Sequence, residues 1–204
     1  MARLLLVRHG ITEFNSTRRF AGSSDVELSA EGQRQVERLR DRLANEKIDA
    51  VYCSDLKRAL VTAEVISSGR KVEIVTCSEL REINYGDAEG LTFDEISQRY
   101  PELAQAIRNF SLELEFPGGE SFEGFIRRTI TFLDRLEKHE PSATILVVSH
   151  SGALRVLLCD LLGIDQNHWR QIGCGNASLS IVNTYPRGAI INLLNDTSHL
   201  PVNL

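Results

Sequence analysis

Several features that mark specialised classes of protein are scarce or missing in this sequence of 204 residues. Its four cysteines have neither Cys-x-x-Cys spacing nor a histidine at zinc-finger distance, so we expect buried, reduced thiols rather than a metal site. Basic residues are not in excess, because 23 lysines and arginines face 28 acidic residues and leave a net charge of −5. A net negative charge argues against binding to nucleic acid or to an anionic membrane. The cysteines are Cys53, Cys77, Cys159 and Cys174.

Long hydrophobic runs are missing as well. The apolar run at residues 4–7 is shorter than the core of a signal peptide. No other stretch approaches the roughly 20 apolar residues of a transmembrane helix. Internal repeats, low-complexity segments and Pro/Ser-rich linkers are also absent. We therefore expect one cytoplasmic domain over residues 1–204, with 42% hydrophobic residues available for its core.

The sequence does contain an alternation of apolar strand patterns and amphipathic helix patterns. The order predicts a three-layer α/β/α sandwich with a mostly parallel central sheet and one antiparallel strand. The expected strands are 3–7, 49–53, 72–76 and 144–149, followed by a hairpin of 178–184 and 189–194. The expected helices are 29–46, 56–68, one capped by Thr92 and ending near Pro101, one capped by Ser121, and 152–162 closed by Gly163.

Two histidines directly follow expected strands. His9 lies in Arg8-His9-Gly10 after the first strand, and His150 follows the strand at 144–149. Open α/β sheets bind their ligands at the carboxyl ends of strands, so we expect the two side chains to share one site. A packing or surface role is the alternative for either histidine alone. We assign such roles to the remaining histidines, which are His139, His168 and His199.

Two arginines near these histidines suit the binding of phosphate. Arg8 precedes His9, and its planar guanidinium can hold a phosphate through two hydrogen bonds. Arg58 lies in the first turn of the helix that follows strand 49–53, where the helix amino terminus also favours anions. The alternative is that Arg58 pairs locally with Asp55.

A site that binds phosphate can also cleave a phosphate ester if it supplies a proton to the departing oxygen. Glu82 is the candidate donor of that proton. It lies in a loop-like segment after the third strand, where a partly buried carboxyl can act as general acid and then as base toward water. Composition does not single it out, because Glu79, Asp87 and Glu89 are close by.

These residues fall into a longer pattern. Residues 6–15 resemble the LVRHGxTxxN signature of the histidine phosphatase family, also called phosphoglycerate-mutase-like. Further family blocks recur in order over nearly the whole chain. They are D-x-x-L-(S/T)-x-x-G at 25–32, S-x-L-x-R-A at 54–59, L-x-E-x-x-x-G-x-x-E-G at 80–90, PGGES at 117–121 and VSH at 148–150.

The resemblance implies roles for the site residues. It makes His9 the phosphorylated nucleophile and Glu82 the proton donor. Arg8, Arg58 and His150 would hold the phosphoryl oxygens. Asn15 would contact phosphate, and Gly22 would bind phosphate or substrate. Ser151 departs from the glycine or other small residue usual after the second histidine, and we expect its hydroxyl to bind phosphate. The loop at 20–25 lacks the basic residue often found after its glycine, which weakens any claim for a second anionic group on the substrate.

The function implied is a metal-independent and cofactor-independent phosphomonoesterase that forms a phosphohistidine. Its substrate would be a small phosphorylated metabolite such as phosphoserine or the α-ribazole-5′-phosphate of cobalamin synthesis, and a homodimer is the candidate assembly. A phosphoglycerate mutase is the alternative enzyme, although the Arg-Arg pairs here, at 18–19 and 127–128, lie outside the mutase context. A non-catalytic phosphate-binding protein is the third hypothesis, although it would not need Glu82.

Residues 91–121 are interpreted as a lid-like insertion. Its acidic segment carries Glu113, Glu115 and Glu120, with Phe14 and Phe20 expected on the opposite wall of the pocket. An acidic rim would repel a second phosphate, so substrates with one phosphate should be preferred. The alternative is a solvated loop that covers part of the core.

Overall fold

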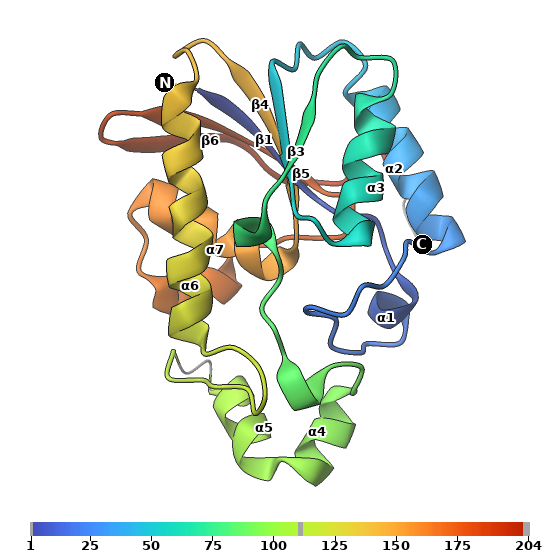
Figure 1. Ribbon diagram of the computed structural model, residues 1–204, viewed down its shortest axis with the longest axis vertical. Coiled ribbons are helices and arrows are strands. Elements are labelled where there is room, and N and C mark those ends of the chain that lie inside the picture. Colours follow the sequence, from blue (N-terminus) through green and yellow to red (C-terminus); the bar gives the residue numbers. More distant parts are fainter. Residues whose placement is uncertain (1, 110–111, 202–204) are drawn as a thin grey trace.

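A six-stranded sheet forms the centre of the computed structural model, which describes residues 2–109 and 112–201. The strand order is β3-β2-β4-β1-β5-β6 (Figure 1). Neighbouring strands from β3 to β1 pair in parallel, whereas β5 is antiparallel to both β1 and β6. The expected sheet is confirmed. Its strands are β1 (Arg3–Arg8), β2 (Ala50–Cys53), β3 (Ile74–Thr76), β4 (Thr144–Ser149), β5 (Leu179–Tyr185) and β6 (Gly188–Asp196).

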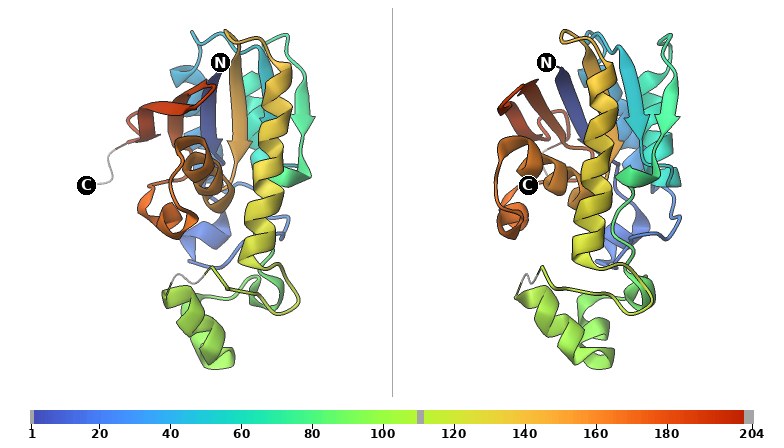
Figure 2. Two further views of the ribbon diagram at one scale, coloured as in Figure 1. Left: turned by 90° about the vertical axis from the view of Figure 1, so that its left-hand side faces the viewer. Right: turned by 60° about the vertical axis from the view of Figure 1, so that its left-hand side comes forward.

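Helices cover both faces of this sheet (Figures 1 and 2). One face carries α2 (Ala30–Arg42) and α3 (Lys57–Ser67), and the other carries α6 (Phe122–Ile130), the 3-10 helix η3 (Thr131–Lys138) and α7 (Ser151–Leu162).

Successive residues of β1 divide between two cores. Leu5 and Val7 pack with α2 and α3, while Leu4 and Leu6 pack with α7. Burial on both faces explains why the central strands are continuously apolar in sequence. The three-layer sandwich is confirmed.

Pro101 begins a helix as well as following one. The capping box at Thr92 starts α4 (Phe93–Arg99) as expected, but α5 (Pro101–Arg108) was not predicted. Proline fits the first position of α5 because the N–H that it lacks would have no partner within the helix. Four other short elements were missed because they are too short to show a periodic pattern. They are α1 (Glu13–Ser16), η1 (Ser78–Leu80), η2 (Gly86–Ala88) and η4 (Gln166–Gln171).

The helices α4 and α5 lie beyond the end of the sheet at which β1 and β4 finish (Figure 1). Their apolar side chains, such as Ile96 and Leu103, join Phe125 of α6 and Val156 of α7 in a third core. The insertion at 91–121 therefore shares its core with the helices beside the site. Residues 110 and 111 of that range lie outside the described residues. In the described part of the chain, no helix has both the length and the apolar character required to cross a bilayer.

All four cysteines are free, as expected, but their burial differs from the prediction in one case. Cys53, Cys77 and Cys159 are buried, whereas Cys174 is partly exposed. Burial raises the pKa of the Cys53 thiol to about 12 and that of Cys77 to about 11, so both thiols stay protonated at neutral pH.

Candidate active site

The sheet brings the two strand-end histidines together. β1 and β4 are parallel neighbours, and Arg8 is in register with Ser149. His9 and His150 follow these residues, and their ring centroids lie 5.1 Å apart. Both side chains are almost completely buried, with exposures of 3% and 0%. The shared site expected from the sequence therefore exists.

His9 has one ring nitrogen fixed by the backbone. Its Nδ1 lies 2.7 Å from the carbonyl oxygen of Gly10, and this contact requires Nδ1 to carry the proton. The Nε2 atom then presents its lone pair. Burial, with the positive charges of Arg58 and Arg8, lowers the pKa of His9 well below 6.5, so the ring is neutral at physiological pH. A neutral, oriented imidazole is suited to nucleophilic attack.

In His150 the other ring nitrogen, Nε2, carries the proton. Its Nδ1 accepts a hydrogen bond from Nε of Arg58 at 3.2 Å, so the proton of the neutral ring is on Nε2. Burial lowers the pKa of His150 well below 6.5, and Arg58 is the next cause. The Nε2 atom is buried without a hydrogen-bond partner among residues 2–109 and 112–201. A buried donor of this kind calls for an acceptor such as a ligand oxygen.

Arg58 is fully buried and is held by the loop before α2. Its Nη1 donates to the carbonyl of Ser24 at 2.7 Å, and its Nη2 donates to those of Ala21 and Gly22 at 3.2 and 2.7 Å. With Nε bonded to His150, one N–H of Nη1 is left for a ligand. The alternative pairing with Asp55 is wrong, because Asp55 is paired with Arg81 at 2.5 Å.

Arg8, whose side chain is partly buried, presents a second guanidinium. Its Nη1 donates to the carbonyl of Cys174 at 2.7 Å, while Nε has no partner in the described chain. Burial lowers the pKa of Arg8, and the nearby carboxylate of Glu82 partly offsets that effect. The site therefore combines two cations with an unpartnered histidine donor, which is an arrangement for binding an oxyanion.

Gly22 lies in the loop that binds Arg58. Its N–H donates to Glu89 at 3.0 Å, and its carbonyl accepts from Arg58 at 2.7 Å. A Cβ atom here would lie 2.0 Å from the carbonyl oxygen of Ile83, so only glycine fits. Gly22 thus belongs to the loop that holds Arg58, and its contact with substrate remains a prediction.

Asn15 and Ser151 lie beside the two histidines. The side-chain oxygen of Asn15 accepts from Thr12 N and from Asn176 at 3.0 and 3.1 Å, which leaves its amide N–H groups for a ligand. Ser151 is the first residue of α7, and His150 is the residue before it. The N–H groups at a helix amino terminus favour an anion. Phosphate contacts by Asn15 and Ser151 remain predictions.

The side chain of Glu82 lies beside the first turn of α7. Its Oε2 accepts from the N–H of Gly152 at 3.0 Å, and its Oε1 accepts from the N–H of Ile83 at 3.1 Å. The side chain is 8% exposed. Two neighbouring carboxylates are engaged elsewhere, since Glu79 pairs with Arg135 at 2.6 Å and Glu89 binds the loop at Gly22. Glu82 is thus fixed beside the histidines.

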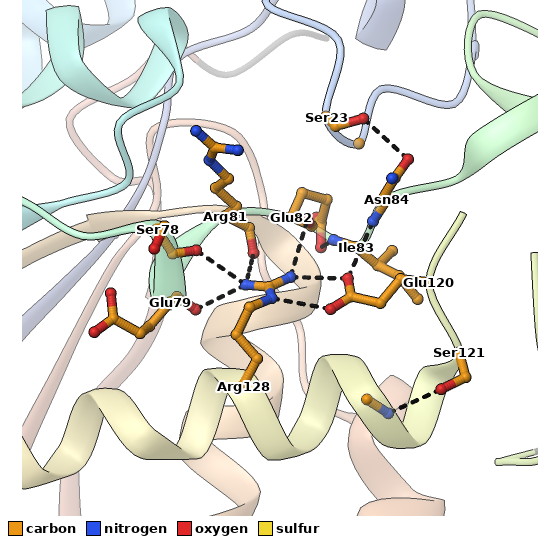
Figure 3. Close-up of polar contacts among 12 residues, drawn as sticks. Ser23, Ser78, Glu79, Arg81, Glu82, Ile83, Asn84, Glu120, Ser121 and Arg128 are labelled. Carbon is orange, nitrogen blue, oxygen red and sulfur yellow. Dashed lines mark hydrogen bonds and ion pairs between the residues drawn. The ribbon is translucent and has the colours of Figure 1, made fainter. Parts of the chain in front are cut away.

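The sequence reasoning missed Arg128 of α6. Figure 3 shows its guanidinium between the segment that carries Glu82 and the carboxylate of Glu120, to which it donates twice at 2.9 Å. Its other acceptors are the backbone carbonyls of Ser78, Glu79, Arg81 and Glu82, at 2.9 to 3.4 Å. The residue therefore positions the candidate proton donor. The sequence held no signal for this role, because the contacted carbonyls lie about 50 residues earlier in the chain.

The predicted acidic rim is not found beside the histidines. Glu120 is neutralised by Arg128, and Glu113 and Glu115 line a separate cavity of about 480 Å³ with Tyr100 and Leu103. None of the site residues lines that cavity. The electrostatic argument against a second anionic group on the substrate therefore loses its basis.

Phe20 belongs to a group of aromatic rings around Tyr85, and its expected place on a wall of the pocket remains a prediction. Its ring lies edge-on to Tyr85 at 4.9 Å, and Tyr85 lies edge-on to Phe116 at the same distance. The carboxylate of Glu82 is near enough to Tyr85 to help burial raise the pKa of the phenol. Tyr85, which was not predicted, thus belongs to the surroundings of Glu82. In residues 2–109 and 112–201, no group of three or more His, Cys, Asp or Glu side chains is arranged to hold a metal ion.

Comparisons with known proteins agree with this geometry. Residues 4–197 match the model of the histidine phosphatase superfamily (branch 1). The chain is 35% identical over 200 residues to phosphoserine phosphatase 1 of Hydrogenobacter thermophilus, covering 98% of this chain and 95% of that protein. It is 32% identical over 205 residues to a probable phosphoglycerate mutase of Yersinia enterocolitica, with coverage of 98% and 95%.

A solved structure of a similar protein has the same fold. The crystal structure of a putative α-ribazole-5′-phosphate phosphatase from Escherichia coli K-12 superposes with a TM-score of 0.91 at 30% identity. The match covers 96% of this chain and 97% of that one. The resemblance seen in the sequence motifs is thus confirmed over nearly the full length of both chains. The chain belongs to the histidine phosphatase superfamily (branch 1), and it is a phosphoric monoester hydrolase.

Proposed function

We propose that this protein is a metal-independent phosphomonoesterase that works through a phosphohistidine at His9. The observation that carries the proposal is the hydrogen bond from Nδ1 of His9 to the carbonyl of Gly10, which leaves Nε2 as a free nucleophile. The unpartnered Nε2 of His150 and the guanidinium of Arg8 supply donors for the phosphoryl oxygens.

The reaction divides into two displacements at phosphorus. In the first, Nε2 of His9 attacks, the bond between phosphorus and the ester oxygen breaks, and Glu82 gives its proton to that oxygen. In the second, water attacks the phosphohistidine, Glu82 takes a proton from the water, and inorganic phosphate leaves with His9 restored. The N-terminus of α7 and the two arginines stabilise the charge on the transferred group.

The substrate we propose is a small metabolite with one phosphate ester, such as phosphoserine or α-ribazole-5′-phosphate. Relatives named for these activities support it, at 35% and 30% identity. The similarity to a probable phosphoglycerate mutase keeps phosphoglycerate mutase as the alternative. Interconversion of 2- and 3-phosphoglycerate faster than release of phosphate would favour it. A cytoplasmic location and a homodimer remain expectations.

The nucleophile can be tested by trapping the intermediate. Brief incubation with a ³²P-labelled substrate should leave acid-labile, base-stable phosphate on the protein, because a phosphorus–nitrogen bond forms at His9. His9→Ala should remove both the label and the turnover. His139→Ala, outside the site, is the control and should keep both. Full turnover by His9→Ala would contradict the proposal.

Metal independence predicts a second result. EDTA should leave the rate unchanged, because the cations that bind the phosphoryl group are arginines. Vanadate should inhibit in competition with substrate, since it adopts the five-coordinate geometry of the transition state. Steady-state kinetics with and without each reagent measure both effects. Loss of activity with EDTA and its recovery with Mg²⁺ would contradict the mechanism.

A further inference from the structure

The buried cation of Arg58 forms no ion pair with any residue in the part of the chain that the structure describes. Its side chain is fully buried, and the partners of its two terminal nitrogens are backbone carbonyls of the loop at 21–24. A buried charge without a paired countercharge is costly unless other groups stabilise it. The groups that hold this loop therefore affect both the charge and the orientation of the guanidinium.

The carboxylate of Glu89 lies on the other side of the same loop. The N–H groups of Gly22 and Ser23 donate to it at 3.0 and 2.8 Å. The carbonyls of these two peptide groups, which belong to Ala21 and Gly22, accept from Nη2 of Arg58 at 3.2 and 2.7 Å. A peptide group is planar and trans, so its N–H and C=O point in opposite directions. The anion and the cation therefore bind opposite edges of the same two rigid groups.

Glu89 is held by further hydrogen bonds on both of its oxygens. Its Oε1 also accepts from the N–H of Tyr85 at 3.1 Å, and its Oε2 accepts from the N–H and the hydroxyl of Ser24 at 3.3 and 2.6 Å. The carboxylate is so close to the loop that a Cβ atom on Gly22 would lie 2.4 Å from Oε1. Because these donors occupy both oxygens, Glu89 acts on a bound phosphate through the loop and not by direct contact.

The charge of Glu89 has two opposite effects on an anion at Arg58. The carboxylate by itself repels a phosphate nearby. It also favours the charged guanidinium, because burial lowers the pKa of Arg58 while the negative charges of Glu82 and Glu89 oppose that effect. A neutral amide in place of the carboxylate would turn N–H groups toward the N–H groups of the loop. Repulsion and positioning therefore predict changes of opposite sign in anion affinity when the carboxylate is removed.

We infer that Glu89 is a positioning residue for the hydrolysis, which orients the guanidinium of Arg58 toward a phosphoryl oxygen through the two peptide groups of the loop. A guanidinium is planar and rigid, so fixing Nη2 also fixes the direction of the N–H that Nη1 has left for a ligand. The inference rests on the role proposed above for the two arginines in stabilising the transferred group.

Vanadate affinity tests the inference in a variant that removes the charge and keeps the size. Glu89→Gln should raise the inhibition constant of vanadate and lower kcat/KM for p-nitrophenyl phosphate, each by roughly tenfold to a hundredfold, because a misplaced Arg58 loses its contact. This substrate is used because its leaving group barely needs the proton of Glu82. In an Arg58→Ala background, Glu89→Gln should change the inhibition constant less than about twofold, because no guanidinium is left to orient.

Glu95→Gln is the matched control. Glu95 also binds a backbone N–H and an arginine, since its Oε2 accepts from Thr92 at 2.7 Å and from Arg19 at 2.9 Å, but it lies on α4 outside the site. This variant should keep the wild-type inhibition by vanadate. If Glu89→Gln melts well below the wild type, Glu89→Asp keeps the charge and shortens the side chain. It should give a smaller loss, which also disappears in the Arg58→Ala background.

Two results would overturn the positioning role of Glu89. One is unchanged or tighter binding of vanadate by Glu89→Gln, because the carboxylate would then act only as a repelling charge or a structural contact. The other is an equal loss with and without the side chain of Arg58. Wild-type vanadate affinity in Arg58→Ala alone would instead overturn the role of Arg58 in the proposed function.

Discussion

His9 and His150 follow strands in the same way, yet the structure gives their rings opposite hydrogen-bonding states. His9 donates from Nδ1 to a backbone carbonyl, so its Nε2 carries the lone pair. His150 accepts at Nδ1 from Arg58, so its Nε2 is a donor. One histidine can therefore attack phosphorus, and the other can bind a phosphoryl oxygen. The partner of each Nδ1 atom decides this difference.

Glu82→Gln tests proton donation at the residue scale. The substitution keeps the size of the side chain and removes the acid, so hydrolysis of alkyl phosphates should slow by about 10²–10⁴-fold. Hydrolysis of p-nitrophenyl phosphate should slow much less, because its leaving group barely needs a proton. Steady-state kcat for both substrates measures the difference. Equal slowing would mean that Glu82 positions other groups instead.

At the scale of elements, the site depends on contacts between segments that are distant in the sequence. The segment from η1 to Glu82 has little regular structure, and a single side chain of α6, Arg128, binds four of its carbonyls (Figure 3). Such carbonyls would otherwise need water. The orientation of Glu82 therefore depends on α6 as well as on its own loop.

Arg128→Met should loosen this segment. Removal of the guanidinium leaves several carbonyls and the partly buried Glu120 without their donor, which should cost about 2–4 kcal/mol of stability. The sensitivity of kcat to the leaving group should also increase, because Glu82 would be poorly placed to donate its proton. Urea unfolding and a series of aryl phosphates measure the two effects.

The neighbouring substitution Arg127→Met is the matched control. Arg127 pairs with Glu123 on the surface, where both side chains are more than 70% exposed. Its loss should change stability by no more than about 0.5 kcal/mol and leave the dependence on leaving group unchanged. Equal effects of the two substitutions on stability and on the leaving-group dependence would contradict the inference that Arg128 positions Glu82.

At the scale of the whole molecule, the buried histidines should make stability depend on pH. Burial lowers the pKa of His9 and His150 in the folded protein, while the unfolded chain binds protons near pH 6.5. Below that pH the unfolded state holds more protons, so the free energy of unfolding should fall as pH decreases from about 7 to 5. Each histidine contributes up to about 1.4 kcal/mol per pH unit. Urea unfolding at several pH values checks this, and His9→Gln should reduce the slope. An unchanged slope in that variant would contradict the assignment.

The local sequence determined the layers of the fold and most of the candidate site. Continuous apolar runs predicted β1 and β4, and histidines placed directly after two neighbouring parallel strands are brought to the same sheet edge. Motif resemblance was needed to choose Glu82 among nearby carboxylates. Periodicity could not detect α1 or η4, because a pattern needs more than one or two turns.

The tertiary structure decided everything that depends on a partner far along the chain. It assigned the carbonyls of Ala21, Gly22 and Ser24 to Arg58 and paired Glu120 with Arg128. The physical reason is that hydrogen bonds and charges act over a few ångströms, and only the folded chain determines which residues are that close.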